Sequence, residues 1–371
     1  MGEAALNEAL AVAARGLPGA GGEQDTEIVV SDEQWPAFIG AITAYRLTGL
    51  ALAAITDGGL SIAPAHAEEI EARHTTNMLR ALALERRMLQ VYDAFASEGI
   101  AAIVLKGPVL ANTIYADPSL RPFLDIDLLV HSDDWRTACG VLAALGFRRG
   151  LPEPKAGFDE RFGKAALHRD QLGQQLDLHR TLVLGPFGLW ARSDELFENT
   201  SWFELGGQSL RRLDDTALLV HACVHAALGA RPPLPIPLRD VAEIASRGDV
   251  DWERFADLVS RWRLGAVIEH TSVALRLRLD VAVAQLDDIG RRVTSTRAET
   301  KALLGYTTDR RQRGGMSVRT LSAIPTLRGK ASYARSLLVP DRDFLDARAS
   351  DGHRSYLKRW GIALGWLSRA P

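Results

Sequence analysis

The sequence is poor in cysteine: its 371 residues include only Cys139 and Cys223. Two cysteines 84 positions apart define neither a disulfide framework nor a cysteine-based metal site, so we expect reduced, buried thiols in a cytoplasmic protein. No apolar run reaches the roughly 20 residues that a membrane-spanning helix needs. The first residues include glutamates and no basic segment, which argues against a secretory signal. These absences exclude a disulfide-stapled secreted module and a membrane-spanning protein.

Net charge is also small, at −2, but it is unevenly distributed. Residues 300–371 contain 14 lysines and arginines against 5 acidic residues, so this segment carries a charge of +9. A solvated or intramolecularly paired tail is the favoured interpretation. Docking to an acidic partner, or folding over the active site, stays open. Nucleic acid is not expected as a partner.

The pattern of apolar residues predicts several structural regions. An amphipathic helix is expected from Ala67 to Glu98, with an apolar stripe that includes Leu79 and Leu82, and Gly99 should end it. Strands and helices then alternate, which favours a mixed α/β arrangement, before the chain becomes helical again. The predicted regions are a flexible N-terminus (1–30), a helical region (31–98), a core (99–213), a C-terminal helical domain (214–295) and an irregular basic tail (296–371) with a possible final helix over 355–367.

The most informative segment runs from Ile100 to Val130 and predicts a strand, a turn, a short helix and a second strand. The second strand begins with Asp125-Ile126-Asp127. Its two carboxylates point to the same face of a strand, with their backbones about 7 Å apart. Such a pair repels itself unless a cation lies between, so it is a natural site for Mg²⁺. The turn at Lys106-Gly107 is a natural site for phosphate.

Further candidate residues surround this pair. A predicted strand over 174–179 places Asp177 and His179 on one face, which adds a third carboxylate on a neighbouring strand. Asp177 is expected to bind the metal or to act as the base, and His179 to orient a water or an acceptor. Lys106, Gly107 and Arg121 are expected to bind the phosphates. Together these groups meet the needs of metal-assisted nucleotidyl transfer, namely carboxylates for Mg²⁺, donors for a triphosphate and a base.

Five stretches carry a resemblance to a known family, and they are LKGPVL, RPFLDIDLLV, QLDLHR, VHACVHAAL and LRDVAEI. With these stretches the chain resembles the uncharacterised nucleotidyltransferase family of the polymerase-β superfamily over about residues 35–290. The resemblance implies a mixed α+β fold, in which a small polymerase-β-type nucleotidyltransferase sheet is flanked by N-terminal and C-terminal helical lobes. It also implies Asp125, Asp127 and Asp177 as metal ligands and catalytic residues.

The phosphate-binding turn departs from the superfamily pattern. Lys106-Gly107 stands where the superfamily usually has Gly-Ser or Gly-Gly. Pro108 follows and offers phosphate neither an N–H nor a hydroxyl. Seventeen residues separate Gly107 from Asp125, which is a longer gap than usual. Lys106 and Arg121 are expected to compensate.

The predicted function is transfer of NMP from an NTP donor to a hydroxyl or phosphate acceptor, which is a peptide, a protein or a metabolite, with release of pyrophosphate. The expected cofactor is Mg²⁺, with Mn²⁺ as the alternative ion. Replacing Asp125 or Asp127 by asparagine should abolish metal-dependent nucleotide binding and leave the fold intact. Two alternatives stay open: a catalytically degenerate nucleotide- or peptide-binding module of the same fold, and a glycosyltransferase that binds a nucleotide sugar through Asp-x-Asp.

Three residues outside this segment have two interpretations each. His221 and His225 lie four positions apart on one predicted helix, which is the spacing of a two-histidine metal site, although a core or interdomain pair is the preferred interpretation. Asp240 either caps its helix and pairs locally or reaches the nucleotide base.

Overall fold

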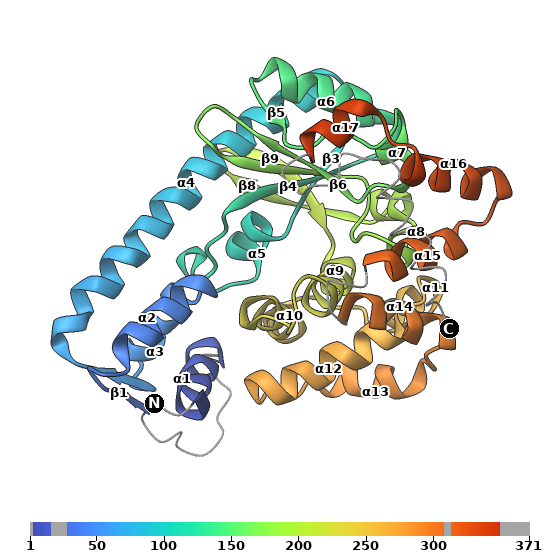
Figure 1. The fold of residues 1–371 in the computed structure, drawn as a ribbon. Helices are drawn as coiled ribbons and strands as arrows, with labels where there is room; N and C mark the ends of the chain where they lie inside the picture. The colour runs from blue at the N-terminus through green and yellow to red at the C-terminus, as the bar shows by residue number, and fades with distance from the viewer. Residues whose placement is uncertain (1–2, 16–27, 308–312, 349–371) are drawn as a thin grey trace.

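The centre of the molecule is a seven-stranded mixed sheet with helices on both sides (Figure 1). The computed structural model describes residues 3–15, 28–307 and 313–348. The strand order is β5-β6-β7-β4-β3-β9-β8, and the β4–β7 and β3–β9 pairs are parallel while the other pairs are antiparallel. This sheet, flanked by helical lobes, confirms the predicted α+β fold. The strands are β3 (Ala102–Leu105), β4 (Asp125–Val130), β5 (Arg148–Arg149), β6 (Ala165–Arg169), β7 (Gln175–His179), β8 (Thr200–Leu205) and β9 (Gln208–Leu213).

The register of the central strands positions the acidic residues. In the parallel β4–β7 pair, Asp127 lies opposite Asp177 and Asp125 lies opposite Gln175. The neighbouring antiparallel pair sets Leu105, the last residue of β3, opposite Asp127. Because side chains alternate along a strand, Asp125, Asp127 and Asp177 emerge on the same face. The turn after β3 therefore lies next to these carboxylates.

Short elements build the N-terminal region before the sheet begins. Residues 1–30 were expected to be flexible, but residues 3–15 form a helix and residues 28–30 pair in parallel with residues 60–62. Ala9, Leu10, Ala13 and Ala14 are buried in the core, and this apolar face explains why the helix is ordered. Residues 16–27 lie outside the described part of the chain. The elements are α1 (Glu3–Arg15), β1 (Ile28–Val30), α2 (Trp35–Ala44), α3 (Thr48–Thr56), β2 (Leu60–Ile62) and η1 (Pro64–His66).

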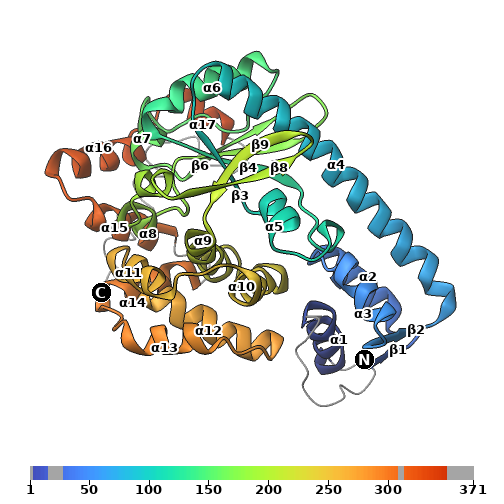
Figure 2. The same ribbon diagram turned by 180° about the vertical axis from the view of Figure 1, so that it is seen from behind.

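Helix α4 (Ala67–Ser97) joins this region to the sheet. Its 31 residues span about 46 Å, and both ribbon views show it running along one edge of the molecule towards α6 (Figure 2). Gly99 follows it at φ +72°, a conformation that favours glycine. The predicted apolar stripe is wrong at its N-terminal end, since Leu79 and Leu82 are 63% and 58% exposed. Ile70 is buried near the N-terminal end, and the other buried residues of α4, namely Leu84, Met88, Val91 and Phe95, lie in its C-terminal half.

Short helices connect the strands, and a second helical group follows the sheet. Asp214 caps the first helix of that group by accepting a hydrogen bond from the backbone N–H of Ala217 at 3.0 Å. The connecting elements are α5 (Gly107–Thr113), η2 (Pro118–Leu120), η3 (Ser132–Asp134), α6 (Trp135–Ala144), α7 (Phe158–Phe162), α8 (Pro186–Trp190) and η4 (Ser193–Phe197). The second group is α9 (Asp215–Leu228), α10 (Pro235–Arg247), α11 (Trp252–Arg261), α12 (Gly265–Leu279) and α13 (Ala284–Arg292).

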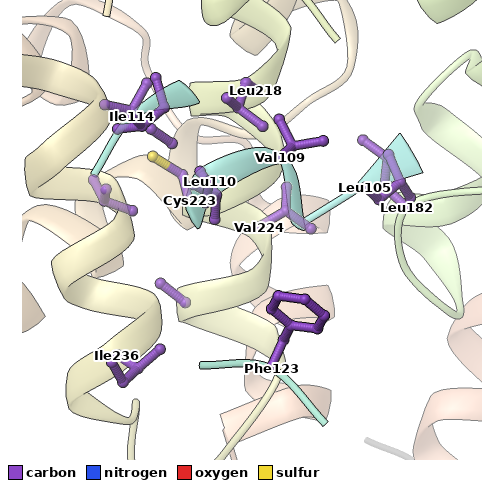
Figure 3. Close-up of a cluster of buried hydrophobic side chains, with 14 of the residues drawn as sticks. Leu105, Val109, Leu110, Ile114, Phe123, Leu182, Leu218, Cys223, Val224 and Ile236 are labelled. Carbon is purple, nitrogen blue, oxygen red and sulfur yellow. The ribbon is translucent and has the colours of Figure 1, made fainter. Parts of the chain in front are cut away.

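A buried apolar cluster joins this helical group to the end of β3. Figure 3 shows Val109 and Leu110 of α5 among Leu218, Cys223 and Val224 of α9. Burying side chains of this size contributes about 1.5–3 kcal/mol each. Helix α5 is thus held between the sheet and α9, and the turn that precedes it is fixed with it.

The basic tail is more ordered than its charge predicts. It was expected to be irregular, yet four helices are present, and Tyr333 packs against Phe158 and Phe162 of α7 with ring centroids 5.8 and 5.3 Å away. Lys155 also donates to Asp341 at 2.7 Å. These contacts supply the apolar and ionic partners that order the segment. The predicted final helix over 355–367 lies outside the described residues. The helices are α14 (Arg297–Thr307), α15 (Arg313–Ala323), α16 (Leu327–Leu338) and α17 (Arg342–Ala347).

Among the described residues, no helix combines the length and the apolar character needed to cross a bilayer. The domain boundaries drawn from the sequence stay a prediction.

His168 on β6 should make the fold sensitive to acid. Its side chain is buried, and burial lowers its pKa from 6.5 to about 4. Between these two values the unfolded chain binds more protons than the folded chain, so the free energy of unfolding falls as pH falls through this window. From pH 7 to pH 5 we expect His168 to account for a loss of about 2 kcal/mol.

The matching variant is His168→Phe, which cannot take up a proton. Urea unfolding at pH 7 and pH 5 should show a loss of stability about 2 kcal/mol smaller in the variant than in the wild type. Equal losses in the two proteins would contradict this role of His168. The remaining buried histidines are present in both proteins, so their contributions cancel in the comparison.

Candidate active site

Adjacent parallel strands bring the three predicted carboxylates to one face of the sheet. Asp127 of β4 and Asp177 of β7 are direct cross-strand neighbours, and Asp125 lies two residues before Asp127. Asp127, Asp177 and His179 each offer one ligand atom, and these three atoms lie within 4.8 Å of one another. Three such groups at this spacing can hold a metal ion. The sequence prediction that these residues meet thus agrees with the geometry, with His179 placed directly at the cluster.

Asp127 is the most tightly held of the three carboxylates. Lys106 donates to Asp127 Oδ1 through Nζ at 2.6 Å, and His179 Nε2 lies 2.7 Å from the same oxygen. Asp127 is buried, and burial alone would raise its pKa. Lys106 and His179 outweigh that effect, so the pKa of Asp127 lies well below its usual range. Asp127 is therefore an anion throughout the physiological pH range.

The other two carboxylates have the opposite electrostatics. Burial raises the pKa of Asp125, and the negative charge of Asp127 raises it further. The same two causes, in the same order, raise the pKa of Asp177. Like charges at one site disfavour ionisation unless a cation compensates them. The cluster as a whole therefore has an unmet demand for positive charge, although Lys106 already neutralises part of it.

Lys106 owes its position to an unusual backbone. It is the residue between β3 and α5, with φ +53° and ψ −119°, a conformation that L-residues rarely adopt. Strain of this kind costs about 1–3 kcal/mol and tends to be kept at functional sites. The cost is offset by the ion pair with Asp127. Lys106 was predicted to bind phosphate, whereas in the structure it contacts Asp127, a candidate metal ligand.

Gly107 has a structural reason to be glycine. It is buried, and a Cβ added there would lie 2.4 Å from Cβ and 2.7 Å from Cγ of Phe123. The phosphate-binding role predicted for Gly107 is therefore not needed to explain the residue. Phe123 occupies the space next to the turn, two residues before the first carboxylate.

Replacing Gly107 by alanine should consequently destabilise the fold. We expect a loss of about 1–3 kcal/mol, because Phe123 or the turn has to shift. The matched control is Gly140→Ala on exposed α6, where nothing lies within 4 Å of the added Cβ. This control should be neutral or more stable by up to about 1 kcal/mol. Urea denaturation of both variants checks the prediction, and equal stability of Gly107→Ala and the wild type would refute the packing explanation.

Arg121 pairs with a carboxylate of helix α10 in the structure, and its predicted role in binding phosphate stays a prediction. Its guanidinium is 2% exposed and donates to both carboxylate oxygens of Asp240, from Nε at 2.6 Å and from Nη2 at 2.8 Å. Nη1 donates to the carbonyl oxygen of Pro122 at 2.9 Å. Tyr115 also donates to Asp240, at 2.9 Å. Asp240 thus neither caps its helix nor pairs within it; it holds the loop before β4 against α10.

The paired histidines of α9 face the interior, with His221 buried and His225 partly buried. Burial lowers the pKa of both His221 and His225 well below the usual value, so both rings are neutral. His221 Nε2 is buried and forms no hydrogen bond within the described part of the chain. The cluster of possible metal ligands found among the described residues does not include either ring.

Two cations near the carboxylates escaped the sequence reasoning. Arg46 lies between α2 and α3, and its electrostatic neighbours include Asp125, Asp127 and Asp240. Lys164 immediately precedes β6, and its neighbours are Lys106, Asp127, Asp177 and Asp125. Neither residue belongs to a recognisable motif. Only the pairing of distant segments brings them here, so no local signal could have identified them.

A mixed sheet that carries carboxylates on adjacent strands, with helical lobes around it, agrees with the predicted nucleotidyltransferase-type fold. A model of the uncharacterised nucleotidyltransferase family matches residues 31–279, which is more than half of the chain, and the chain belongs to this family. A comparison with curated proteins gives no match. Among solved structures, the chain is similar to one described as an antigenic nucleotidyltransferase-like protein from Paracoccidioides brasiliensis. The two share 15% identity over 45% of this chain and 75% of that chain, with a TM-score of 0.29.

Proposed function

We propose that the protein transfers a nucleoside monophosphate from an NTP to a hydroxyl or phosphate acceptor, using Mg²⁺ or Mn²⁺. Asp125, Asp127 and Asp177 would hold the ion. The observation that carries the proposal is the cluster of Asp127, Asp177 and His179 within 4.8 Å, with Asp125 on the same strand face. Carboxylate oxygens suit Mg²⁺, and the raised pKa values of Asp125 and Asp177 indicate that the site lacks positive charge. The donor set therefore fits the proposed ion.

The proposed reaction is a displacement at the α-phosphorus of the donor. The acceptor oxygen forms a bond to this phosphorus, and the bond from phosphorus to the oxygen that bridges the α- and β-phosphates breaks. Pyrophosphate leaves with the electron pair of the broken bond. The proton of a hydroxyl acceptor passes to a carboxylate, for which we favour Asp177. Its raised pKa brings it closer to the range of an effective general base. A bound divalent ion would stabilise the charge on the phosphoryl oxygens.

The first test is a thermal-shift panel of ATP, GTP, CTP, UTP and two nucleotide sugars, each with and without Mg²⁺ or Mn²⁺. A ligand at 100 times its Kd adds about 2.7 kcal/mol to the free energy of unfolding, which gives a visible shift. A metal-dependent shift with one triphosphate, followed by pyrophosphate release on adding an acceptor, is the expected result. Stabilisation by nucleotide sugars alone would instead favour a glycosyltransferase. The mixed order of this sheet argues against that alternative, because a longer Rossmann-like sheet is expected there.

A catalytically inactive nucleotide-binding protein is the second candidate. The observation that favours it is the contact of Lys106 with Asp127, because an ammonium group already takes up part of the carboxylate charge. Pro108, which follows Gly107, also removes one backbone donor from the turn. Metal-dependent binding of a triphosphate without pyrophosphate release, across peptide, protein and small-molecule acceptors, would support this candidate.

We propose the cytoplasm as the place of action. Both cysteines are free thiols, and burial raises the pKa of Cys139 to about 11, which leaves it unreactive. Burial likewise raises the pKa of Cys223. Thiols that carry no disulfide are typical of a reducing compartment.

A further inference from the structure

Two cations flank the row of carboxylates and have no partner of their own. Within residues 3–15, 28–307 and 313–348, the side chains of Arg46 and Lys164 form neither a hydrogen bond nor an ion pair. Lys106 and Arg121, the other cations of this region, each pair with a carboxylate at 2.6 Å. Arg46 and Lys164 thus differ from their neighbours in having no protein group to satisfy them.

The backbone holds Arg46 close to the first carboxylate. A Cβ added to Gly49, at the start of α3, would lie 2.6 Å from the carbonyl oxygen of Ser119, so α3 lies directly on η2. The chain runs from η2 through Arg121 into Asp125. Arg46 precedes α3 in a left-handed conformation at φ +61°. A non-glycine residue in this conformation is strained, which points to a reason for keeping an arginine side chain there.

Lys164 lies at the opposite end of the carboxylate row. Its carbonyl oxygen accepts from the N–H of Arg180 at 2.8 Å, so it sits beside the last residue of β7. The next residue, Ala165, is the cross-strand partner of His179. Arg46 therefore approaches from the side of Asp125, and Lys164 from the side of Asp177 and His179. Both cations have Asp125 and Asp127 among their electrostatic neighbours, and Lys164 also has Asp177.

Both cations carry a net cost of burial that the neighbouring carboxylates offset only in part. Burial lowers the pKa of Lys164, and its neighbour Lys106 lowers it further. Burial and Arg121 lower the pKa of Arg46 in the same way. A partly buried cation with no ion pair destabilises the empty protein. Such a group is expected where an anion from outside completes the site.

We propose that Arg46 and Lys164 form a clamp for the polyphosphate of the donor, one at each end of the carboxylate row. The clamp rests on the proposed function and names the groups that take the place of Arg121 and Gly107 in binding phosphate. Arginine binds phosphate oxygens with a planar fork, and lysine acts as a point charge. The turn after β3 then needs to supply few phosphate-binding groups. The missing backbone N–H of Pro108 therefore does not prevent phosphate binding.

The test measures binding of inorganic triphosphate to the full chain by titration calorimetry in the presence of Mg²⁺. Arg46→Gln and Lys164→Gln should each weaken binding by about tenfold or more, since each removes one charge-assisted contact. The conservative variants Arg46→Lys and Lys164→Arg should retain most of the affinity. Arg80→Gln, which removes an exposed arginine of α4, is the control and should bind as the wild type does.

Folding and binding can be separated in these variants. Arg46→Gln removes a charge next to Arg121 and no ion pair, so its thermal stability without ligand should equal or exceed that of the wild type. A folded Arg46→Gln and a folded Lys164→Gln that both bind triphosphate as tightly as the wild type would overturn the clamp. Absence of triphosphate binding by the wild type would overturn it as well.

The outcome is independent of turnover. Triphosphate binding that depends on Arg46 and Lys164, without pyrophosphate release from any NTP, would leave the clamp in place and reject the transfer reaction. Pyrophosphate release by variants that lack both cations would support the transfer reaction and reject the clamp.

Discussion

Arg121→Met is expected to lower the free energy of unfolding by about 3–5 kcal/mol. The substitution leaves the Asp240 carboxylate 2% exposed and without its cation, and a buried charge that loses its partner is among the costliest defects in a fold. Asp240 holds this cation with a two-point contact and also raises the pKa of Arg121 against the effect of burial. Urea unfolding followed by circular dichroism measures the loss.

Two further variants show whether the pair acts as a unit. Arg121→Lys should recover little stability, because an ammonium group cannot reproduce the two parallel contacts of a guanidinium. The double variant Arg121→Met with Asp240→Leu should be far more stable than Arg121→Met alone, since it removes both buried charges. The sum of the single losses would exceed the loss in the double variant.

The same experiment decides between two roles of Arg121. If Arg121→Met keeps the stability of the wild type and loses only affinity for triphosphate, the phosphate-binding role expected from the sequence is right and the buried pair is not. The structural role has a functional consequence in any case. Arg121 and Asp240 are 119 residues apart, so their contact fixes α10 against the loop that leads into Asp125.

The fold and the carboxylates could be predicted from sequence because their signals are local. Alternation along Asp125–Val130 and Gln175–His179 placed the acidic side chains on one face before the strands were known to be neighbours. The spacing of two residues within each strand is fixed by backbone geometry alone. The register of the β4–β7 pair then places Asp127 opposite Asp177.

The remaining site residues depend on contacts between distant segments. Arg121 looked available for phosphate because its partner Asp240 lies in another lobe, and no pattern near Arg121 reveals that contact. Gly107 looked like a phosphate-binding glycine because the neighbouring ring of Phe123 lies 16 residues further on. Arg46 and Lys164 were overlooked for the same reason. Local patterns identified the strands that carry charge, whereas charge pairing is a property of the tertiary structure.

The basic tail shows the same limit in a different way. Its excess charge predicted an irregular segment, since a high net charge opposes compaction. The folded tail contacts residues from other parts of the chain, including the aromatic rings of α7 and the ammonium group of Lys155. Its helices α14–α17 are stabilised by packing against the core region.

Asp125→Asn and Asp127→Asn should both remove metal-dependent nucleotide binding but should differ in stability. Asp125 takes part in no hydrogen bond or ion pair through its side chain within the described residues, and its raised pKa shows that its charge is unfavourable in the empty site. Asparagine at this position should leave the free energy of unfolding unchanged or slightly higher. An intact fold therefore stays the prediction for this variant.

Asp127→Asn should instead lose about 2–4 kcal/mol, because Lys106 and His179 both lose their anionic partner. This is a correction to the expectation that the two aspartates are equivalent. Thermal shift with and without Mg²⁺ and the preferred triphosphate, together with urea unfolding of the empty proteins, measures both effects. A strong destabilisation by Asp125→Asn would make Asp125 a structural residue and count against its role as a metal ligand. A stable Asp127→Asn would mean that the ion pair between Lys106 and Asp127 does not stabilise the fold. Lys106 would then be free to bind phosphate.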